Sequence, residues 1–150
     1  MSIRTPRRQG GVTLIELLVV VAIVGILASI AYPSYQVQVA RSWRTQAIAC
    51  LEEMAQGMER RFTGAMSYAG TEPPGNSCAI DASPSWAVLD ADLAERYEFG
   101  FVADPEQTTY TLEAVPLGQQ AAADARCGTL SLDQAGRRGA SGDASAEDCW

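Results

Sequence analysis

The sequence predicts an α+β fold in which one long N-terminal helix packs on a small antiparallel sheet of three to four strands. Three observations lead to this prediction. An uncharged apolar run near the N-terminus continues into a segment with helical periodicity, several short segments after residue 95 have the alternation of strands, and four cysteines lie beyond the apolar run. At 150 residues, the chain suits one compact domain in addition to the apolar run.

The charge and the residue types exclude several kinds of chemistry. All 11 basic residues are arginine, histidine is absent, and 18 acidic residues give a formal net charge of −7. Without histidine, Ser-His-Asp and Cys-His arrangements and zinc sites with imidazole ligands are unavailable. An acidic chain is also a poor general binder of nucleic acid, because that affinity comes from neutralising phosphates. We expect no catalytic residue, no cofactor, no metal ion and no nucleic-acid partner.

The apolar run follows a short basic leader. No charged residue stands between Leu17 and Ala40, and the run is long enough to cross a hydrocarbon core of about 30 Å. Because arginines precede it and none follows until Arg41, we expect the leader in the cytoplasm and the remainder outside. Three interpretations compete: a secretory signal peptide with a small-residue site at Ser29-Ile30-Ala31, a plain membrane anchor, and a prepilin signal that is cut before the run.

Glu16 favours the prepilin interpretation. A carboxylate in an apolar run costs roughly 2.5–3.5 kcal/mol at the bilayer centre, and neither a signal peptide nor an anchor gains from it. A cut after Gly11 would create a free amine on Val12, one helical turn before Glu16. The carboxylate would also lie near the positive end of the helix dipole, where an anion is favoured.

The run GGVTLIELLVVVAIVGILASIAYPSY resembles the class III signal of type IVa pilins and related pseudopilins. The resemblance implies that a membrane aspartyl peptidase cuts between Gly11 and Val12. It also implies methylation of the new N-terminus at Val12, a position where the family usually has phenylalanine. Glu16 then becomes the fifth mature residue, with a role in assembly. Gly25 and Pro33 fall where the family softens its helix.

The resemblance divides the chain into a cleaved basic leader (1–11), a transmembrane and filament-core helix (12–35) and a globular pilin head (36–150). We expect one helix from Thr13 to about Phe62, roughly 50 residues or about 75 Å long. Within the head, one face of this helix carries apolar residues at helical spacing and is expected to pack on the globular domain. That face comprises Trp43, Ala47, Leu51, Met54 and Met58. Arg44 and other charged residues lie off it.

The second half of the chain predicts a loop followed by strands. Glycine and proline mark residues 63–95 as a loop-rich connection, which includes an optional short strand within 84–90. Alternating residues predict strands over 97–103 and 109–114, joined by a turn. A third strand is expected over 128–132, ended by Gln-Ala-Gly. These three strands should bury one face against the helix.

The four cysteines predict two disulfides formed in an oxidising compartment, with three connectivities open. We favour Cys50 with Cys78, which would fasten the helix to the long loop. Cys127 would then pair with Cys149 and close the C-terminal segment. Each bond is expected to contribute about 3–4 kcal/mol by restricting the unfolded chain.

The C-terminal segment CGTLSLDQAGRRGASGDASAEDCW resembles the end of PilE-type minor pilins, where a loop closed by a cysteine follows the last strand. Major pseudopilins of type II secretion typically lack this disulfide loop and carry a calcium site there. Asp133, Asp143 and Asp148 offer oxygen atoms, but their spacing is not that of an EF-hand. We interpret them as solvated loop acids.

These observations predict a structural minor pilin that contributes to pilus assembly or initiation and to pilus-dependent motility or adhesion. Its expected partners are major and minor pilins in a filament, the prepilin peptidase and the inner-membrane assembly platform. It would span the inner membrane once, with a periplasmic head, and then join an extracellular pilus.

Three alternatives stay open. One is a receptor for DNA uptake or adhesion, supported by Arg137-Arg138, and another is a type II secretion pseudopilin. The third is an exported enzyme built on paired acids. Its candidate residues show no sign of convergence, so we do not expect an enzyme. They are Asp90, Asp92, Glu95 and Glu98.

Overall fold

A computed structural model describes residues 13–72, 78, 80 and 91–150 of the chain. The chain consists of two compact units, Met1–Tyr35 and Gln36–Trp150. One long helix contributes to both units, and the described residues of the second unit also form a four-stranded sheet and three short helices. The α+β class and the long N-terminal helix predicted from the sequence are therefore confirmed.

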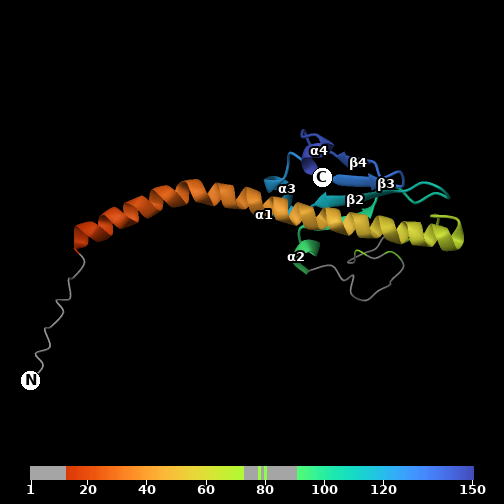
Figure 1. The fold of residues 1–150 in the computed structure, drawn as a ribbon, viewed down its shortest axis with the longest axis horizontal. Helices are drawn as coiled ribbons and strands as arrows, with labels where there is room; N and C mark the ends of the chain where they lie inside the picture. The colour runs from red at the N-terminus through yellow and green to blue at the C-terminus, as the bar shows by residue number, and fades with distance from the viewer. Residues whose placement is uncertain (1–12, 73–77, 79, 81–90) are drawn as a thin grey trace, which may run out of the picture. The chain divides into compact units, whose positions relative to one another are not determined.

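Helix α1 runs from Leu14 to Ala65 and contains 52 residues (Figure 1). Pro33 lies inside it without ending it. The helix continues past Phe62, the predicted end, and stops immediately before Met66. Met66 has a φ of 54°, in the left-handed region, and its N–H donates to the Phe62 carbonyl at 2.7 Å. This conformation is a common way to end a helix.

The sheet contains four antiparallel strands in the order β1-β2-β3-β4. Their bounds are β1 Tyr97–Phe101, β2 Thr111–Pro116, β3 Leu130–Asp133 and β4 Arg138–Ala140. The predicted strands 97–103 and 109–114 extend too far into the turn between them. Glu106 and Thr109 close that turn, since the Glu106 N–H donates to the Thr109 carbonyl at 2.9 Å and the Thr109 hydroxyl to the Glu106 carboxylate at 3.1 Å.

Strand β4 was not predicted. The optional fourth strand was placed within 84–90, which lies outside the described residues. The Asp133 carboxylate accepts from the backbone N–H groups of Ala135 and Arg137, each at 2.9 Å, and turns the chain back along β3. In β4, Gly139 pairs with Ser131, where a Cβ would lie 2.4 Å from the serine hydroxyl oxygen. A strand of three residues with a central glycine has no alternation that sequence reasoning can detect.

The core of the head lies between α1 and the inner face of the sheet (Figure 1). In the predicted apolar stripe of α1, four side chains are buried, namely Ala47, Leu51, Met54 and Met58. Trp43, at the start of the stripe, is only partly buried, but it packs against the same core. The sheet supplies alternate residues, including Tyr97, Phe99, Leu112, Ala114, Leu130 and Leu132.

Two disulfides link segments of the head that lie far apart in the sequence. Cys50 on α1 is bonded to Cys78, and Cys127 is bonded to Cys149, with Cα–Cα distances of 5.0 and 5.6 Å. This is the pairing that we favoured from the sequence. The three short helices are α2 Ala91–Ala94, α3 Gly118–Ala123 and α4 Ala146–Cys149. None of them was predicted, because each is at most 6 residues long.

Candidate functional site

The apolar segment of α1 is the first candidate. Its large side chains are exposed, from Leu14 at 81% to Val37 at 51%. The most apolar stretch of α1 has a mean hydropathy of 2.8, and α1 is the one helix among the described residues that is long and apolar enough to cross a membrane. Exposed apolar surface of this extent calls for burial in lipid or against other chains.

Glu16 lies in the first turn of α1, where the helix leaves unpaired N–H groups. Its backbone N–H donates to the Thr13 carbonyl at 3.1 Å and to the Thr13 hydroxyl at 3.3 Å. The Thr13 hydroxyl thus caps the helix through the Glu16 backbone N–H, and the spacing of the two residues is that of a capping box. The Glu16 carboxylate itself has no hydrogen-bond or ion-pair partner among the described residues.

The other predicted residues of this segment are only partly described. Gly11 and Val12, the predicted cleavage and methylation positions, lie outside the described residues. Gly25 and Pro33 both lie within the continuous helix α1, and a Cβ at Gly25 would meet no heavy atom within 4 Å. A softening of the helix at these two positions stays a prediction.

A buried polar network attaches α1 to the C-terminal half of the head. Arg44 on α1 forms an ion pair with Asp124 just after α3, and their side chains are 12% and 8% exposed. The Tyr97 hydroxyl donates to the other Asp124 oxygen at 3.4 Å. The Gln120 amide donates at 3.0 Å both to the Tyr97 hydroxyl oxygen and to the Ala40 carbonyl. Each of these five residues therefore makes at least one hydrogen bond or ion pair within the network.

Burial dominates the electrostatics of this network. It raises the pKa of Asp124 above its ordinary value, although the Arg44 guanidinium opposes the rise. Burial likewise raises the pKa of Tyr97 to about 12. A buried ion pair of this kind fixes geometry more than it stabilises the fold, because desolvation offsets most of the attraction.

The two arginines of the C-terminal loop both have acidic partners. Arg137 pairs with Asp133 at 2.6 Å, and Arg138 pairs with Glu52 on α1 at 2.8 Å. The Arg138 guanidinium also lies 5.2 Å from the centre of the Trp150 ring. This pairing lowers the positive charge that the loop presents to a phosphate backbone.

Asp133 behaves differently from Asp124. Burial favours its neutral form, but hydrogen bonds from the Arg137 backbone and side chain and from the Ala135 N–H outweigh burial and lower the pKa of Asp133. The folded state therefore prefers the charged carboxylate. The resulting stability is present above the unfolded pKa of about 3.9 and is lost as the pH falls through the folded pKa.

The other acidic residues considered as ligands or catalysts do not form a metal site in the part of the chain that the structure describes. Asp133, Asp143 and Asp148 do not gather as metal ligands, and the described part of the chain contains no group of three or more acidic or cysteine side chains able to hold a metal ion. Of the acids considered for hydrolysis, Asp92 lies on α2 and Glu98 on β1, and Asp90 lies outside the described residues.

Comparisons with known proteins identify the family. A model for the prokaryotic N-terminal methylation motif matches residues 6–32. A second model, described as "Type IV minor pilin ComP, DNA uptake sequence receptor", matches residues 33–131, which is more than half of the chain. The chain belongs to this family of type IV minor pilins. The predicted family is thereby confirmed, and the match to the methylation motif includes the predicted cleavage position of this pilin.

Individual relatives of the pilin match part of its length. It is 43% identical to the type IV major pilin protein PilE1 of Neisseria gonorrhoeae over 76 residues, 51% of this chain and 44% of that protein. It is 44% identical to the fimbrial protein EcpC of Eikenella corrodens over 71 residues, 47% of this chain and 44% of EcpC. The chain thus spans less than half the length of these curated relatives. A solved structure of a type IV pilin from Shewanella oneidensis has a TM-score of 0.44 and 26% identity, covering 66% of this chain and 89% of that one.

Sequence reasoning missed two features of the pilin. The capping pair of Thr13 and Glu16 was detectable, because the spacing T-x-x-E before an apolar run marks a helix start. The ion pair of Arg44 with Asp124 had no such signal, because the two residues are 80 positions apart.

Proposed function

We propose that this pilin is a structural subunit of the minor class in a type IV pilus, where it supports pilus assembly or initiation and thereby motility or adhesion. Pilins assemble into filaments with other pilins. The observation that carries the proposal is Glu16, whose carboxylate has no partner among residues 13–72, 78, 80 and 91–150 and lies in an exposed apolar helix segment that matches the N-terminal methylation motif. An apolar helix that leaves lipid can bury its surface against the same segment of other subunits.

The proposed mechanism begins in the inner membrane. The chain spans it once, with residues 36–150 on the periplasmic side. The prepilin peptidase cuts between Gly11 and Val12, and the new amine of Val12 is methylated. On assembly, Glu16 of one subunit pairs with the Val12 amine of a neighbour, so that two charges neutralise each other in a dry core.

The next step moves the segment 12–35 from lipid into the filament core of an extracellular pilus. The inner-membrane assembly platform would drive this step. Gly25 and Pro33 support a local loosening of the helix, because they cost about 1 and 3 kcal/mol in a helix interior. No catalytic residue is required for any of these steps.

The deciding test is intact mass and N-terminal sequencing of the protein from cells with and without the prepilin peptidase. A peptidase-dependent start at Val12 supports the proposal. A start at Tyr32 would indicate a secreted protein, and an uncut chain in both strains would indicate a plain anchor. Either of these results contradicts the filament mechanism.

A second candidate function is DNA uptake, because the matching family model is described as a DNA uptake sequence receptor. Arg137 and Arg138 lend it little support, since both are paired with carboxylates. The test is binding of a labelled DNA duplex to the full chain in detergent, before and after Arg137→Ala with Arg138→Ala. Binding that falls in the double variant assigns the role to these arginines, and no binding by the intact chain removes the candidate.

A further inference from the structure

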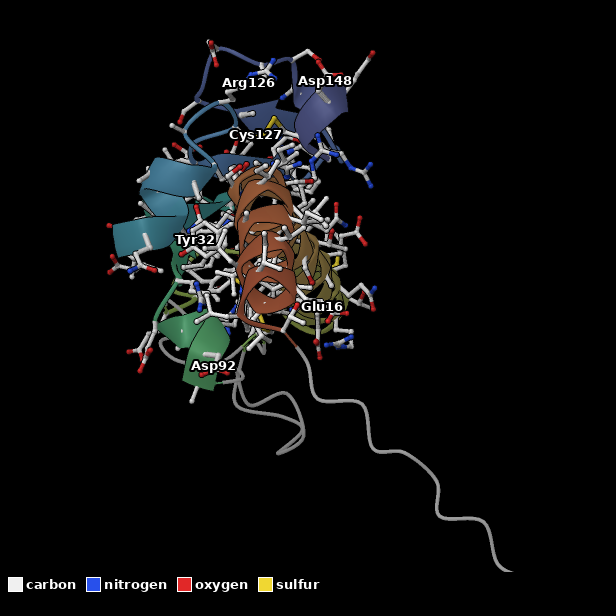
Figure 2. All side chains as sticks on the ribbon, turned by 90° about the vertical axis from the view of Figure 1, so that its left-hand side faces the viewer. Glu16, Tyr32, Asp92, Arg126, Cys127 and Asp148 are labelled. Carbon is white, nitrogen blue, oxygen red and sulfur yellow. A yellow bond between two sulfur atoms is a disulfide. The ribbon has the colours of Figure 1, made fainter. Side chains whose placement is uncertain are left out.

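The head contains a hollow lined by arginines, near the point where the part of α1 that belongs to the head begins. It has a volume of about 430 Å³, within the range of small-ligand sites. Three arginines line it, namely Arg41, Arg44 and Arg126, together with Asp124 and Asp148. In the view of Figure 2, Arg126 and Asp148 both lie above Cys127.

Two of the three arginines are available to a ligand. Arg44 is committed to Asp124, whereas Arg41 and Arg126 are exposed and have no ion-pair partner among the described residues. Asp148, the other acid of the hollow, accepts a hydrogen bond from the Ser145 hydroxyl at 2.8 Å. The hollow therefore presents two unpaired guanidinium groups, which suit an anionic oxygen ligand.

This positive charge stands out against the acidity of the head. Residues 36–150 contain 8 arginines and 17 acidic residues. Three other arginines of the head are occupied: Arg137 and Arg138 are paired with acids, and Arg96 lies 4.6 Å from the centre of the Trp43 ring. The gathering of Arg41 and Arg126 at one hollow is therefore not explained by the average charge of the surface.

The backbone holds Arg126 in place. Its carbonyl accepts from the Ala144 N–H at 2.9 Å, and the neighbouring Cys127 carbonyl accepts from the Gly142 N–H at 3.0 Å. Gly142 approaches so closely that a Cβ would lie 2.1 Å from the Arg126 carbonyl oxygen. The Cys127–Cys149 disulfide holds this segment to the C-terminus, and the Arg44 guanidinium, which donates to the Cys127 sulfur at 3.1 Å, links it to α1.

The place of Arg41 in the sequence, soon after the apolar run, indicates the source of the anion. Tyr32 and Tyr35 close the apolar run and are 66% and 68% exposed, and tyrosines with this placement are typical of the membrane–water interface. Arg41 lies six residues after Tyr35, about 9 Å along a helix. In a bilayer of about 30 Å hydrocarbon and 40–45 Å total thickness, the headgroup region extends about 5–8 Å beyond the hydrocarbon, so the long side chain of Arg41 can reach back to the phosphates.

We propose that Arg41 and Arg126 bind the phosphate of a phospholipid headgroup while the subunit is still in the membrane. This inference rests on the proposed function, because it requires α1 to span the bilayer. The lipid would hold the head at the membrane surface. It would be released when the subunit moves into the filament.

The test is a titration of the full chain in neutral detergent with phosphatidylglycerol, followed by native mass spectrometry. Diacylglycerol, which lacks the phosphate, is the ligand control. We expect one saturable phosphatidylglycerol site and no specific binding of diacylglycerol. Arg41→Gln with Arg126→Gln should weaken binding roughly 25-fold, from about fivefold per arginine. The converse variant Asp148→Asn should bind about fivefold more tightly, because it removes a carboxylate from the hollow.

A charge-matched control is available in Arg137→Gln with Arg138→Gln, which removes the same formal charge away from the hollow. It should change phosphatidylglycerol binding less than twofold. Equal weakening in both double variants would overturn the proposal, since general charge would then explain the binding. Glycerophosphoglycerol binding as tightly as the intact lipid would also overturn it, in favour of a soluble phosphate site. So would a loss of DNA binding in Arg41→Gln with Arg126→Gln while lipid binding stays unchanged.

Two further measurements separate failure of this proposal from failure of the proposed function. Resistance of the cell-derived chain to carbonate extraction reports membrane insertion, and its N-terminal residue reports processing. A chain that is inserted and starts at Val12, but binds phosphatidylglycerol equally with and without Arg41 and Arg126, refutes the lipid site alone. Because both side chains are exposed, the variants should keep the circular dichroism spectrum of the parent.

Discussion

Glu16 has two possible roles, and the substitution Glu16→Gln separates them. The first is local: its spacing from Thr13 allows the Glu16 side chain to complete a capping box, of which the structure shows the bond from the Glu16 backbone N–H to the Thr13 hydroxyl. The proposed function adds a second role, in which the carboxylate neutralises the Val12 amine of a neighbouring subunit. Glutamine serves as well as glutamate at the third position of a capping box, but it carries no charge. Glu16→Gln therefore keeps the first role and removes the second.

The free energies expected for the two roles differ enough to decide between them. Loss of the charge near the helix N-terminus costs about 0.3–1 kcal/mol through the dipole. An amine left unpaired in a dry filament core costs about 3–5 kcal/mol. The second figure corresponds to a factor of roughly 140 to 3,700 in the equilibrium for adding one subunit, at about 1.4 kcal/mol per tenfold.

The assay measures the variant in sheared filaments relative to the membrane fraction, together with its N-terminal mass. We expect Glu16→Gln to be cut at Val12 as efficiently as the parent but to be lost from filaments to the same extent as Glu16→Ala. Thr13→Ala is the control, since it removes the cap, keeps the carboxylate and costs about 1 kcal/mol. Normal incorporation of Glu16→Gln, together with failure of Thr13→Ala, would refute the charge-pairing mechanism and leave only capping.

Three predictions concern the head, and each is measured by chemical denaturation of the full chain in detergent. Replacing both Cys127 and Cys149 by serine should lower the free energy of unfolding by about 3 kcal/mol, because the bond closes a loop with a sequence separation of 22. Met54→Ala should cost about 2–5 kcal/mol, because Met54 is fully buried between α1 and the sheet. Because the folded state lowers the pKa of Asp133, the ionised carboxylate stabilises the parent above about pH 4, and this contribution is lost below that pH. Asp133→Asn should remove this pH-dependent contribution.

Matched controls and contrary outcomes apply to the last two predictions. Met66→Ala should change stability by less than about 0.5 kcal/mol, because Met66 is 72% exposed. Equal losses for Met54 and Met66 would mean that the core is not where the structure places it. For Asp133, the control is Asp104→Asn in an exposed turn. A pH profile for Asp133→Asn that coincides with that of the parent would contradict the hydrogen-bond account.

The long-range pattern of the fold was predictable because the responsible residues repeat. The spacing of Ala47, Leu51, Met54 and Met58 at helical period identified the buried face of α1, and burial of all four confirms it. Alternation identified three strands, although their ends were placed too far into a turn. Closure of that turn depends on Glu106 and Thr109, whose two hydrogen bonds have no counterpart in the alternation pattern.

The short elements were not predictable for a different reason. Strand β4 and helix α4 contain three and four residues, too few for any periodic signal. Their positions depend on tertiary contacts. The hydrogen bonds that the Asp133 carboxylate accepts turn the chain into β4. The disulfide between Cys127 and Cys149 fixes the position of α4. The Trp150 indole then donates to the Gly139 carbonyl at 2.9 Å, which joins the end of the chain to β4.

The contrast between Glu16 and Arg44 shows which kind of functional residue can be identified from the sequence alone. Glu16 directly precedes a run from Leu17 to Ala40 that contains no charged residue, so a single carboxylate is conspicuous and its cost in lipid can be stated. Arg44 stands among other charged residues of a helix that faces water on one side, so its 12% exposure and its pairing with Asp124 leave no trace in the local pattern. Arg41 and Arg126 have the same difficulty, since their meeting at one hollow depends on the folding of segments more than 80 residues apart. The membrane segment could therefore be interpreted residue by residue, whereas the polar chemistry of the head required the three-dimensional structure.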